Sequence, residues 1–250
     1  TFTTRQAFTY DIVGTEHALN ALSLNDLSHR IGGVFGSILA GILIATVGTG
    51  GQYVAITICF IIAFLILLLT QNVGQFAPVN RQSILSNLIS YIRLIRGNRT
   101  LMTLMLLTSA TEVFGFTNQS LLPIFARDVL GVGAIGLGVM TAVRQAGGAL
   151  GLIALANLGN YRRKGMLTFI SAIGFGLTQM ALFFTSIWVL FLIILASINA
   201  FASVADTLYK MIMQENVANE ERGRAMGAWV LSIGVSPVGH IGIGAIAGVF

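Results

Sequence analysis

Two ionisable side chains lie deep inside long apolar stretches, where their types suit proton or anion chemistry. Glu112 lies twelve residues after the start of the stretch 100–125, and Arg144 lies near the middle of the stretch 133–158. At about 1.5 Å per helical residue, Glu112 is about 18 Å into its helix, near the middle of a bilayer. An ionised group there costs about 2.5–3.5 kcal/mol, so it is expected to face a cavity, pair with a counter-charge or bind a proton. Glu112 is therefore a candidate proton-coupling or substrate residue, with a static ion pair as the alternative.

Arg144 is the expected partner of Glu112. The two residues lie at similar distances from opposite ends of consecutive antiparallel stretches. We expect them to pair in one conformation and to separate in another, or Arg144 to hold an anionic group of a substrate. Because arginine keeps its charge, Arg144 would modulate Glu112 and would not carry protons itself.

Further polar residues in the apolar stretches divide into two kinds. Asn118, Gln119 and Asn199 are expected to line a polar path, with hydrogen bonds between helices as the alternative. Asp206 and Lys210 are spaced i,i+4 with the acid first, which favours a local ion pair. The residues expected in gates or cytoplasmic turns are Arg30, Asp206, Lys210, Arg162, Arg163, Arg222 and Arg224.

Three pairs of glycines are spaced four residues apart in the apolar stretches: Gly32 with Gly36, Gly147 with Gly151, and Gly244 with Gly248. Each pair makes a smooth stripe on a helix, along which another backbone can approach closely. Sliding of one helix past another and tight static packing are both compatible with this pattern.

The composition requires a lipid environment for the elements that carry these residues. Of the 250 residues, 55% are hydrophobic and only 9% are charged, and the mean hydropathy is +0.85. The uncharged runs 31–80 and 165–205 are each long enough for two crossings of about 20 residues. Soluble enzymes, nucleic-acid-binding proteins and secreted disulfide scaffolds are excluded, since the lone Cys59 has no partner and the basic residues fall in short clusters between apolar runs.

The sequence predicts an all-α polytopic membrane protein with about seven transmembrane helices. The expected crossings are 15–48, 52–71, 100–125, 133–158, 165–184, 187–212 and 222–250. Basic connections alternate with nearly neutral ones, and the positive-inside rule places the basic connections in the cytoplasm. An apolar stripe within 84–95 predicts an interfacial helix in a linker. We therefore expect residues 1–71 to end one bundle, 72–99 to form a cytoplasmic linker, and 100–250 to form most of a second bundle.

An internal repeat indicates how these bundles are related. Residues 13–41 align with residues 217–244, and the two helices involved are six crossings apart and run in the same direction. Such a repeat predicts parallel six-helix halves, which is one of the known transporter plans. The chain has no initial Met and ends inside an apolar run, so we expect it to be a fragment.

Short motifs along almost the whole chain carry a family resemblance. They include Asn20-Ala21-Leu22-Ser23, Leu39-Ala40-Gly41, Leu122-Pro123-Ile124-Phe125, Gly136-Leu137-Gly138 and Glu221-Arg222-Gly223-Arg224. With these motifs the sequence resembles a Major Facilitator Superfamily transporter of the bacterial branch of drug, macrolide and siderophore (enterobactin-type) exporters. The resemblance implies that the seven helices are the fifth to eleventh of a twelve-helix (6+6) fold in the cytoplasmic (inner) cell membrane. It also implies proton-coupled export of small amphiphilic compounds by alternating access, with lipid, protons and a small molecule as partners and a monomer at full length.

Two departures and several absent motifs limit this expectation. The glycines between Gly32 and Gly36 lack the proline that is usual in antiporters, and Asn160 stands where an acid is common in a gating turn. No sequence motif for a zinc protease, a nucleophile elbow or a phosphate-binding loop is present. We therefore expect no enzyme activity, no cofactor, no metal and no nucleic-acid partner. Facilitated uptake without proton coupling and a non-transporting membrane scaffold remain the alternatives.

Overall fold

The structure, a computed structural model, is helical throughout the part of the chain that it describes. It describes the backbone of residues 2–69, 92, 95–116, 118–158, 163–217 and 222–247, and their side chains outside 2–27, 214, 222–226, 228 and 243–247. The chain forms two compact units, residues 1–81 with 133–142, and residues 82–132 with 143–250. The α-helices are α1 (Phe2–Leu68), α3 (Arg99–Ala110), α4 (Asn118–Ile124), α5 (Gly133–Asn157), α6 (Lys164–Phe183), α7 (Trp188–Glu215), α8 (Arg222–Ile233) and α9 (Ser236–Ala247).

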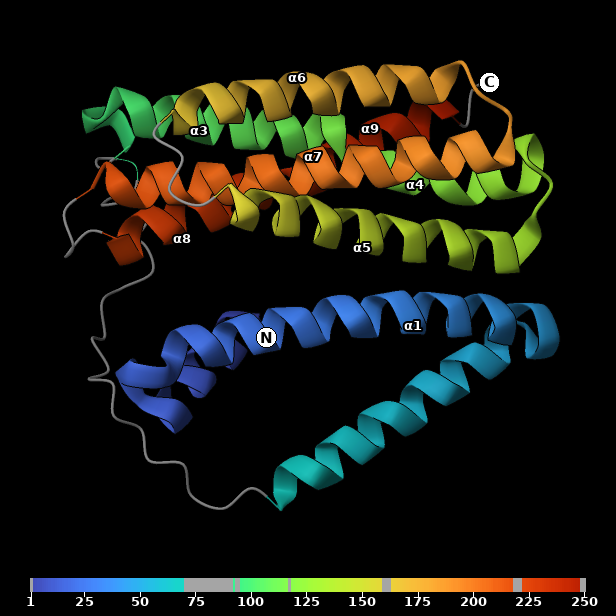
Figure 1. Ribbon diagram of the computed structural model, residues 1–250. Helices are drawn as coiled ribbons and strands as arrows, with labels where there is room; N and C mark the ends of the chain where they lie inside the picture. The colour runs from blue at the N-terminus through green and yellow to red at the C-terminus, as the bar shows by residue number, and fades with distance from the viewer. Residues whose placement is uncertain are drawn as a thin grey trace. The chain divides into compact units, whose positions relative to one another are not determined.

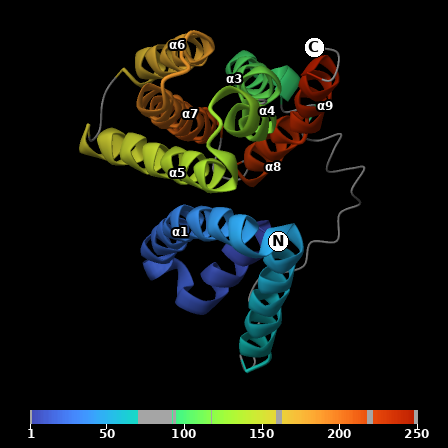
Figure 2. The ribbon, with the colours of Figure 1, turned by 90° about the vertical axis from the view of Figure 1, so that its right-hand side faces the viewer.

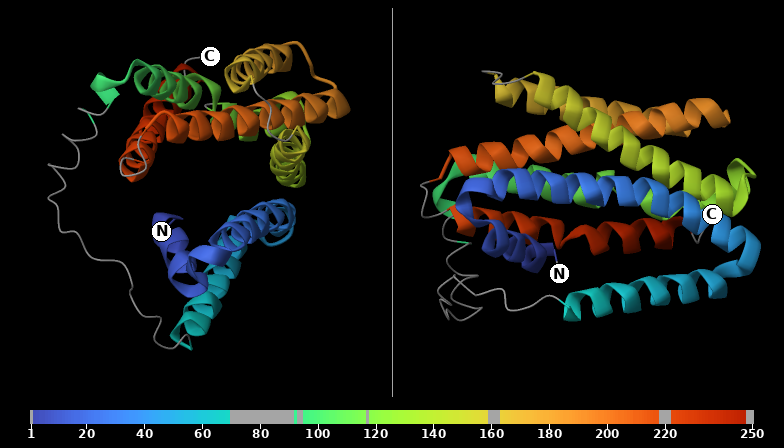
Figure 3. Two further views of the ribbon diagram at one scale, coloured as in Figure 1. Left: turned by 60° about the vertical axis from the view of Figure 1, so that its left-hand side comes forward. Right: turned by 60° about the horizontal axis from the view of Figure 1, so that its bottom comes forward.

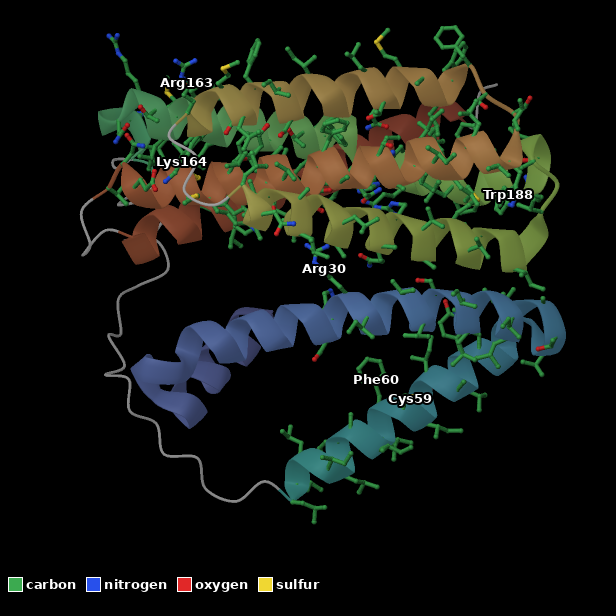
Figure 4. All side chains as sticks on the ribbon, in the orientation of Figure 1. Arg30, Cys59, Phe60, Arg163, Lys164 and Trp188 are labelled. Carbon is green, nitrogen blue, oxygen red and sulfur yellow. The ribbon has the colours of Figure 1, made fainter. Side chains whose placement is uncertain are left out.

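In the first unit, α1 folds back on itself instead of forming two separate helices (Figure 1). Gly48, where the sequence predicts a turn, has a φ of 73°, in the left-handed region that glycine adopts without steric cost. The chain reverses near this residue, so that one assigned helix has two arms, as a second viewpoint also shows (Figure 3). Cys59 and Phe60 lie on the second arm (Figure 4), whose large apolar side chains are mostly exposed, as expected for a lipid-facing surface.

Two helix backbones of the first unit approach each other closely at Gly41 and Gly138. A Cβ atom built on Gly41 would be 2.7 Å from the carbonyl oxygen of Ala134, and one on Gly138 would be 2.6 Å from that of Ser37. Both positions therefore require glycine. Cβ atoms on Gly32 and Gly36 would meet no described atom within 4 Å.

The second unit places α3, α4, α6, α7, α8 and α9 side by side, as the view along the bundle shows (Figure 2). α6 and α7 are antiparallel and joined by a short turn, and α7 also contacts α3 and α8. Five buried residues from α3, α7 and α8 form one cluster within its apolar core: Leu104, Ala205, Tyr209, Met213 and Trp229. Since α7 contacts α3, α6 and α8, it is the helix that these three helices have in common.

The crossing predicted at 100–125 is interrupted by π-helical turns. The π-helical segments η1 (Thr111–Gly115) and η2 (Phe125–Val129) lie on either side of α4. Pro123 within α4 has no N–H to donate, and Gly115 leaves room for the ring of Phe175 against the backbone. Local composition thus explains why the α-helical hydrogen bonds are not continuous here.

The crossing predicted at 222–250 is also interrupted. α8 ends at Ile233, and α9 begins at Ser236 with Pro237 as its second residue. Proline is favoured in a first helical turn, where the N–H groups have no intrahelical acceptor, and it cannot continue a preceding helix. The break therefore coincides with the only proline of this segment.

Five described helices are long and apolar enough to cross a membrane: Ser28–Leu68, Arg99–Val129, Gly133–Asn157, Lys164–Phe183 and Trp188–Met213. Trp229–Gly242 is a shorter apolar helix. The difference from the seven predicted crossings arises because the arms of α1 count as one helix and the last crossing is broken. Of the predicted linker 72–99, only residues 92 and 95–99 are described, so its interfacial helix lies outside the described residues. The domain boundaries stay predictions.

Candidate functional site

Two charged side chains pair on α7, in the half of the helix nearer its C-terminal end, and a third lies near them. The Nζ atom of Lys210 is 2.8 Å from Oδ2 of Asp206, one helical turn away. Nζ also lies 4.2 Å from the ring centroid of Trp229, which is within the range of a cation–π contact. Glu112 is the third member, because its charged neighbours are Asp206 and Lys210. We call Glu112, Asp206 and Lys210 the charged cluster.

Glu112 lies where two helices are interrupted. It is the second residue of the π-helical turn η1, and its carboxylate accepts a hydrogen bond from Ser236 at the start of α9. The first turn of a helix has unpaired N–H groups and a positive partial charge, both of which favour a carboxylate. Single π-helical turns occur often at functional sites, because the extra residue redirects a side chain. Glu112 therefore bridges η1 and the break between α8 and α9.

The charged cluster contains two carboxylates and one ammonium group. With both acids ionised its net charge is −1, and one bound proton makes it neutral. Asp206 and Lys210 are each 33% exposed, so neither is sealed from its surroundings. Chemically, the arrangement can exchange a single proton between a charged and a neutral state.

Aromatic packing and end contacts hold the cluster in place. The buried Tyr209 and Trp229 belong to the apolar core, and Thr111 and Asp206 are the polar neighbours of the Tyr209 hydroxyl. Beyond the cluster, the Asn98 side chain accepts hydrogen bonds from the first N–H groups of α3 and donates to the carbonyl oxygen of Asn216 at 3.0 Å. The C-terminal end of α7 is thereby attached to the start of α3.

The expected pair of Glu112 and Arg144 does not form in this structure. Cβ atoms on Gly147 and Gly151 of α5 would lie 2.6 and 2.7 Å from the Cα atoms of Ala196 and Ala200 on α7. α5 and α7 are therefore parallel and in register, and Arg144 lies one turn before Gly147.

This register places Arg144 far from the charged cluster along α7. Asp206 is ten residues beyond Ala196, and Arg144 lies a further turn back, so Arg144 and Asp206 differ by about 15–20 Å along the helix axis. The separation seen here is compatible with the expectation that the two residues separate in one conformation, so their pairing in another conformation stays a prediction.

The polar residues beyond Glu112 form hydrogen bonds between helices. Asn118 donates to Oε1 of Gln179 at 2.9 Å, and the amide of Gln179 donates to the carbonyl oxygen of Gly115. The Oγ atom of Ser120 and Nδ1 of His240 are 2.6 Å apart. Asn118 thus forms a hydrogen bond between helices in this structure, which was the alternative to lining a polar path.

The described hydrogen bonds of two other predicted path residues are to residues three or four positions earlier in the chain. The side chain of Asn199 donates to the carbonyl oxygen of Leu195 at 3.2 Å. The described bond of Gln119 is from its backbone N–H to the carbonyl oxygen of Phe116. A lining role for either residue stays a prediction.

The remaining predicted residues are spread over several elements. Arg163 is exposed just before α6, and the adjacent Lys164 forms an ion pair with Glu215 (Figure 4). Arg30 is partly exposed on α1. Arg222, Arg224 and Gly244 lie in α8 and α9 outside the described side chains, and Arg162 and Gly248 lie outside the described residues. Among the described residues, no group of three or more His, Cys, Asp or Glu side chains is placed to hold a metal ion.

Sequence reasoning missed Ser236, Gln179 and Trp229 as neighbours of the polar residues. A Ser-Pro pair is typical of a helix start, so Ser236 carried a recognisable signal for a helix break inside the last apolar stretch. Gln179 is a polar residue in a long uncharged run, which marks it as a candidate for a hydrogen bond between helices. No comparable sequence signal identifies Trp229.

Known proteins match the chain over almost its full length. The Staphyloferrin A transporter of Staphylococcus aureus is 24% identical, and the match covers 98% of this chain and 62% of the relative. The Enterobactin exporter EntS of Shigella flexneri is 26% identical, with 94% of this chain and 57% of the relative covered. EntS of Citrobacter koseri is also 26% identical, with 94% and 58% covered. The chain thus spans about three fifths of the length of these relatives. No solved structure matches it significantly.

The match to a whole family is broader than any of these pairwise matches. The sequence profile of the Major Facilitator Superfamily matches residues 1–247, which include every described helix. The helical architecture without described strands and the long apolar helices agree with a partial fold of this kind. The chain is therefore a multi-pass membrane protein that belongs to the Major Facilitator Superfamily.

Proposed function

We propose that the protein is a secondary active transporter that exports small amphiphilic compounds, such as drugs or siderophores, in exchange for protons. The observation that carries the proposal is the charged cluster, in which Lys210 pairs with Asp206 and the carboxyl group of Glu112 lies near this pair within the apolar helices. Charges at such positions are costly and are typical of proton and substrate pathways. We further propose that it works as a monomer, and that it lies in the cytoplasmic membrane, which its bacterial relatives suggest.

In this proposal, Glu112 is the proton carrier. Burial and the nearby Asp206 favour its protonated form, whereas Ser236 and Lys210, together with the start of α9, favour its ionised form. A proton on Glu112 removes the charge on which these contacts depend, and so it weakens the link between η1 and α9. The interruptions at η1 and between α8 and α9 are the places where the helices can change direction at low cost.

Asp206 and Lys210 act in this proposal as the gate that senses the proton. While Glu112 is ionised, Lys210 lies between two acids, and when Glu112 is neutral, Lys210 is left to Asp206 alone. Trp229 stays beside Lys210 through its cation–π contact. The charge state of Glu112 is thereby linked to the packing of α8 against α7.

The direction of transport and the class of compound rest on the relatives. Two of the matches reported above are named as exporters of enterobactin and one as a transporter of staphyloferrin A. Both compounds are therefore the first probes to test. A protein that moved them without any dependence on a proton gradient would instead be a permease.

Transport in proteoliposomes tests the proposal. The protein is expressed from the longest open reading frame that contains residues 1–250 and is assayed with enterobactin and with staphyloferrin A. We expect accumulation driven by a pH gradient, and we expect Glu112→Gln to abolish this accumulation while it preserves exchange of labelled for unlabelled compound. Equal gradient-driven accumulation by Glu112→Gln would overturn the role of Glu112, and no flux of either compound would favour a scaffold.

A further inference from the structure

We propose that Arg144 binds an anionic group, most simply a carboxylate, of the compound that the protein transports. The proposal rests on the transport function proposed above and names the chemistry of its substrate. Arg144 lies on α5, at a level along α7 that is distinct from the charged cluster.

Arg144 is a cation without a described counter-charge. Its Nε atom is buried and has no hydrogen-bond partner among the described residues. The ion pairs among the described residues are Arg127 with Asp128, Lys164 with Glu215, and Lys210 with Asp206. No described charged group lies close enough to Arg144 to stabilise its charge. A guanidinium group does not release its proton in proteins, so it cannot avoid the cost of burial by becoming neutral. An anion that reaches it would remove that cost.

Neutral polar residues lie at the same depth as Arg144. Gly174 of α6 lies against Phe201 of α7, and Lys164 pairs with Glu215, so the two antiparallel helices bring Gln179 to the level of about residue 196 of α7. Gly147, one turn from Arg144, lies at that same level. Gln179 holds Asn118, and a short distance along α4 Ser120 contacts His240. We call Asn118, Gln179, Ser120 and His240 the polar belt.

This combination suits one class of ligand. A guanidinium group recognises a planar carboxylate through two parallel charge-assisted hydrogen bonds, which is a stronger contact than a neutral hydrogen bond. The amide, hydroxyl and imidazole groups of the polar belt can exchange their present partners for polar groups of the same ligand. The apolar surroundings accept the rest of an amphiphile. The charged cluster, with its two carboxylates, is unsuited to an anion, so proton and anion have separate places.

A matched pair of ligands tests the proposal at equilibrium. The expressed transporter is purified in detergent, and binding of 1-pyrenebutyrate and of its uncharged amide is measured by fluorescence anisotropy at one pH. We expect the unmodified protein to prefer the carboxylate, and Arg144→Gln to weaken carboxylate binding at least about tenfold with no change for the amide. Arg144→Lys should fall between these values. Arg127→Gln, which removes the same charge from an exposed residue, is the control and should bind both ligands normally.

Three outcomes would overturn the proposal. The first is no preference of the unmodified protein for the carboxylate. The second is an equal loss of both ligands in Arg144→Gln and in Arg144→Lys, which would indicate a structural role. The third, when Arg144→Gln does not fold, is an Arg144→Lys variant that weakens binding of the amide as much as binding of the carboxylate. Because the binding measurement uses no proton gradient, Glu112→Gln should keep the preference for the carboxylate. The result for Arg144 therefore does not depend on whether Glu112 couples transport to protons.

Discussion

The charged cluster on α7 and the surroundings of Arg144 on α5 lie at two polar levels along these parallel helices, and their charged groups are paired differently. At the charged cluster, opposite charges lie together, with Lys210 Nζ 2.8 Å from Asp206. At the level of Arg144, a single cation has no described partner. The comparison indicates that the charged cluster can change its net charge by binding a proton, whereas Arg144 can bind an anion that is not part of the protein.

The close contact of α5 with α7 keeps these levels apart, and breaking it should give the largest effect. Leucine at Gly147 or Gly151 would push into the backbone of α7 at Ala196 or Ala200. We expect a loss of about 3 kcal/mol or more in stability, measured as a lower midpoint of thermal unfolding in detergent. Gly176→Leu is the control, because a Cβ there meets no described atom within 4 Å, and it should unfold normally. Equal stability of all three variants would contradict the register of α5 on α7.

Removal of the shared ammonium group should disturb the charged cluster next most strongly. Lys210→Gln leaves Glu112 and Asp206 without their cation, and since Asp206 is 33% exposed we expect a loss of only about 1 kcal/mol in stability. We also expect gradient-driven transport to fail. The double variant Asp206→Asn with Lys210→Gln removes one charge of each sign and should recover most of the stability. If the double variant were less stable than Lys210→Gln, the negative charge of Asp206 would not be what destabilises Lys210→Gln.

The link from Glu112 to α9 should be weaker than the ion pair. Ser236→Ala removes one hydrogen bond to Glu112 and the hydroxyl group at the start of α9. We expect a loss of about 0.5 kcal/mol, at the low end for one hydrogen bond, and a change in the pH dependence of transport. The mild variant Ser236→Thr retains a hydroxyl group and should behave like the unmodified protein. An unchanged pH profile in Ser236→Ala would separate Ser236 from proton coupling.

The ion pair outside both levels should matter least. Lys164 and Glu215 have side chains that are 21% and 46% exposed, and exposed pairs contribute about 0–1 kcal/mol. Lys164→Gln should therefore lower the unfolding midpoint only slightly and leave the binding of pyrene ligands unchanged. A drop as large as that of Lys210→Gln would mean that the two polar levels are not the main sites of charge sensitivity.

The two levels also show what the sequence could and could not predict. Hydropathy and charge distribution identified a polytopic helical protein, because each apolar run must form a helix in lipid. The pair of Asp206 and Lys210 followed from helix geometry alone, since both residues lie on one turn. The position of Gly48 at a reversal of the chain was recognisable for the same local reason.

Long-range neighbours were not predictable in the same way. The partner of Glu112 depends on how far η1 is shifted along α7 and on a helix break at Ser236, and neither follows from counting residues from a helix end. Likewise Asn118 finds Gln179 on another helix, more than sixty residues along the chain. These contacts depend on the packing of helices, which the hydropathy of each segment does not determine.

Proton release on ligand binding tests the central claim most directly, because binding and protonation are linked when both act on one conformational equilibrium. Enterobactin is titrated into the detergent-purified transporter by calorimetry in two buffers of different ionisation enthalpy, at one pH. We predict that the unmodified protein releases protons when the compound binds and that Glu112→Gln binds it without release. Equal proton release from the unmodified protein and from Glu112→Gln would contradict the account.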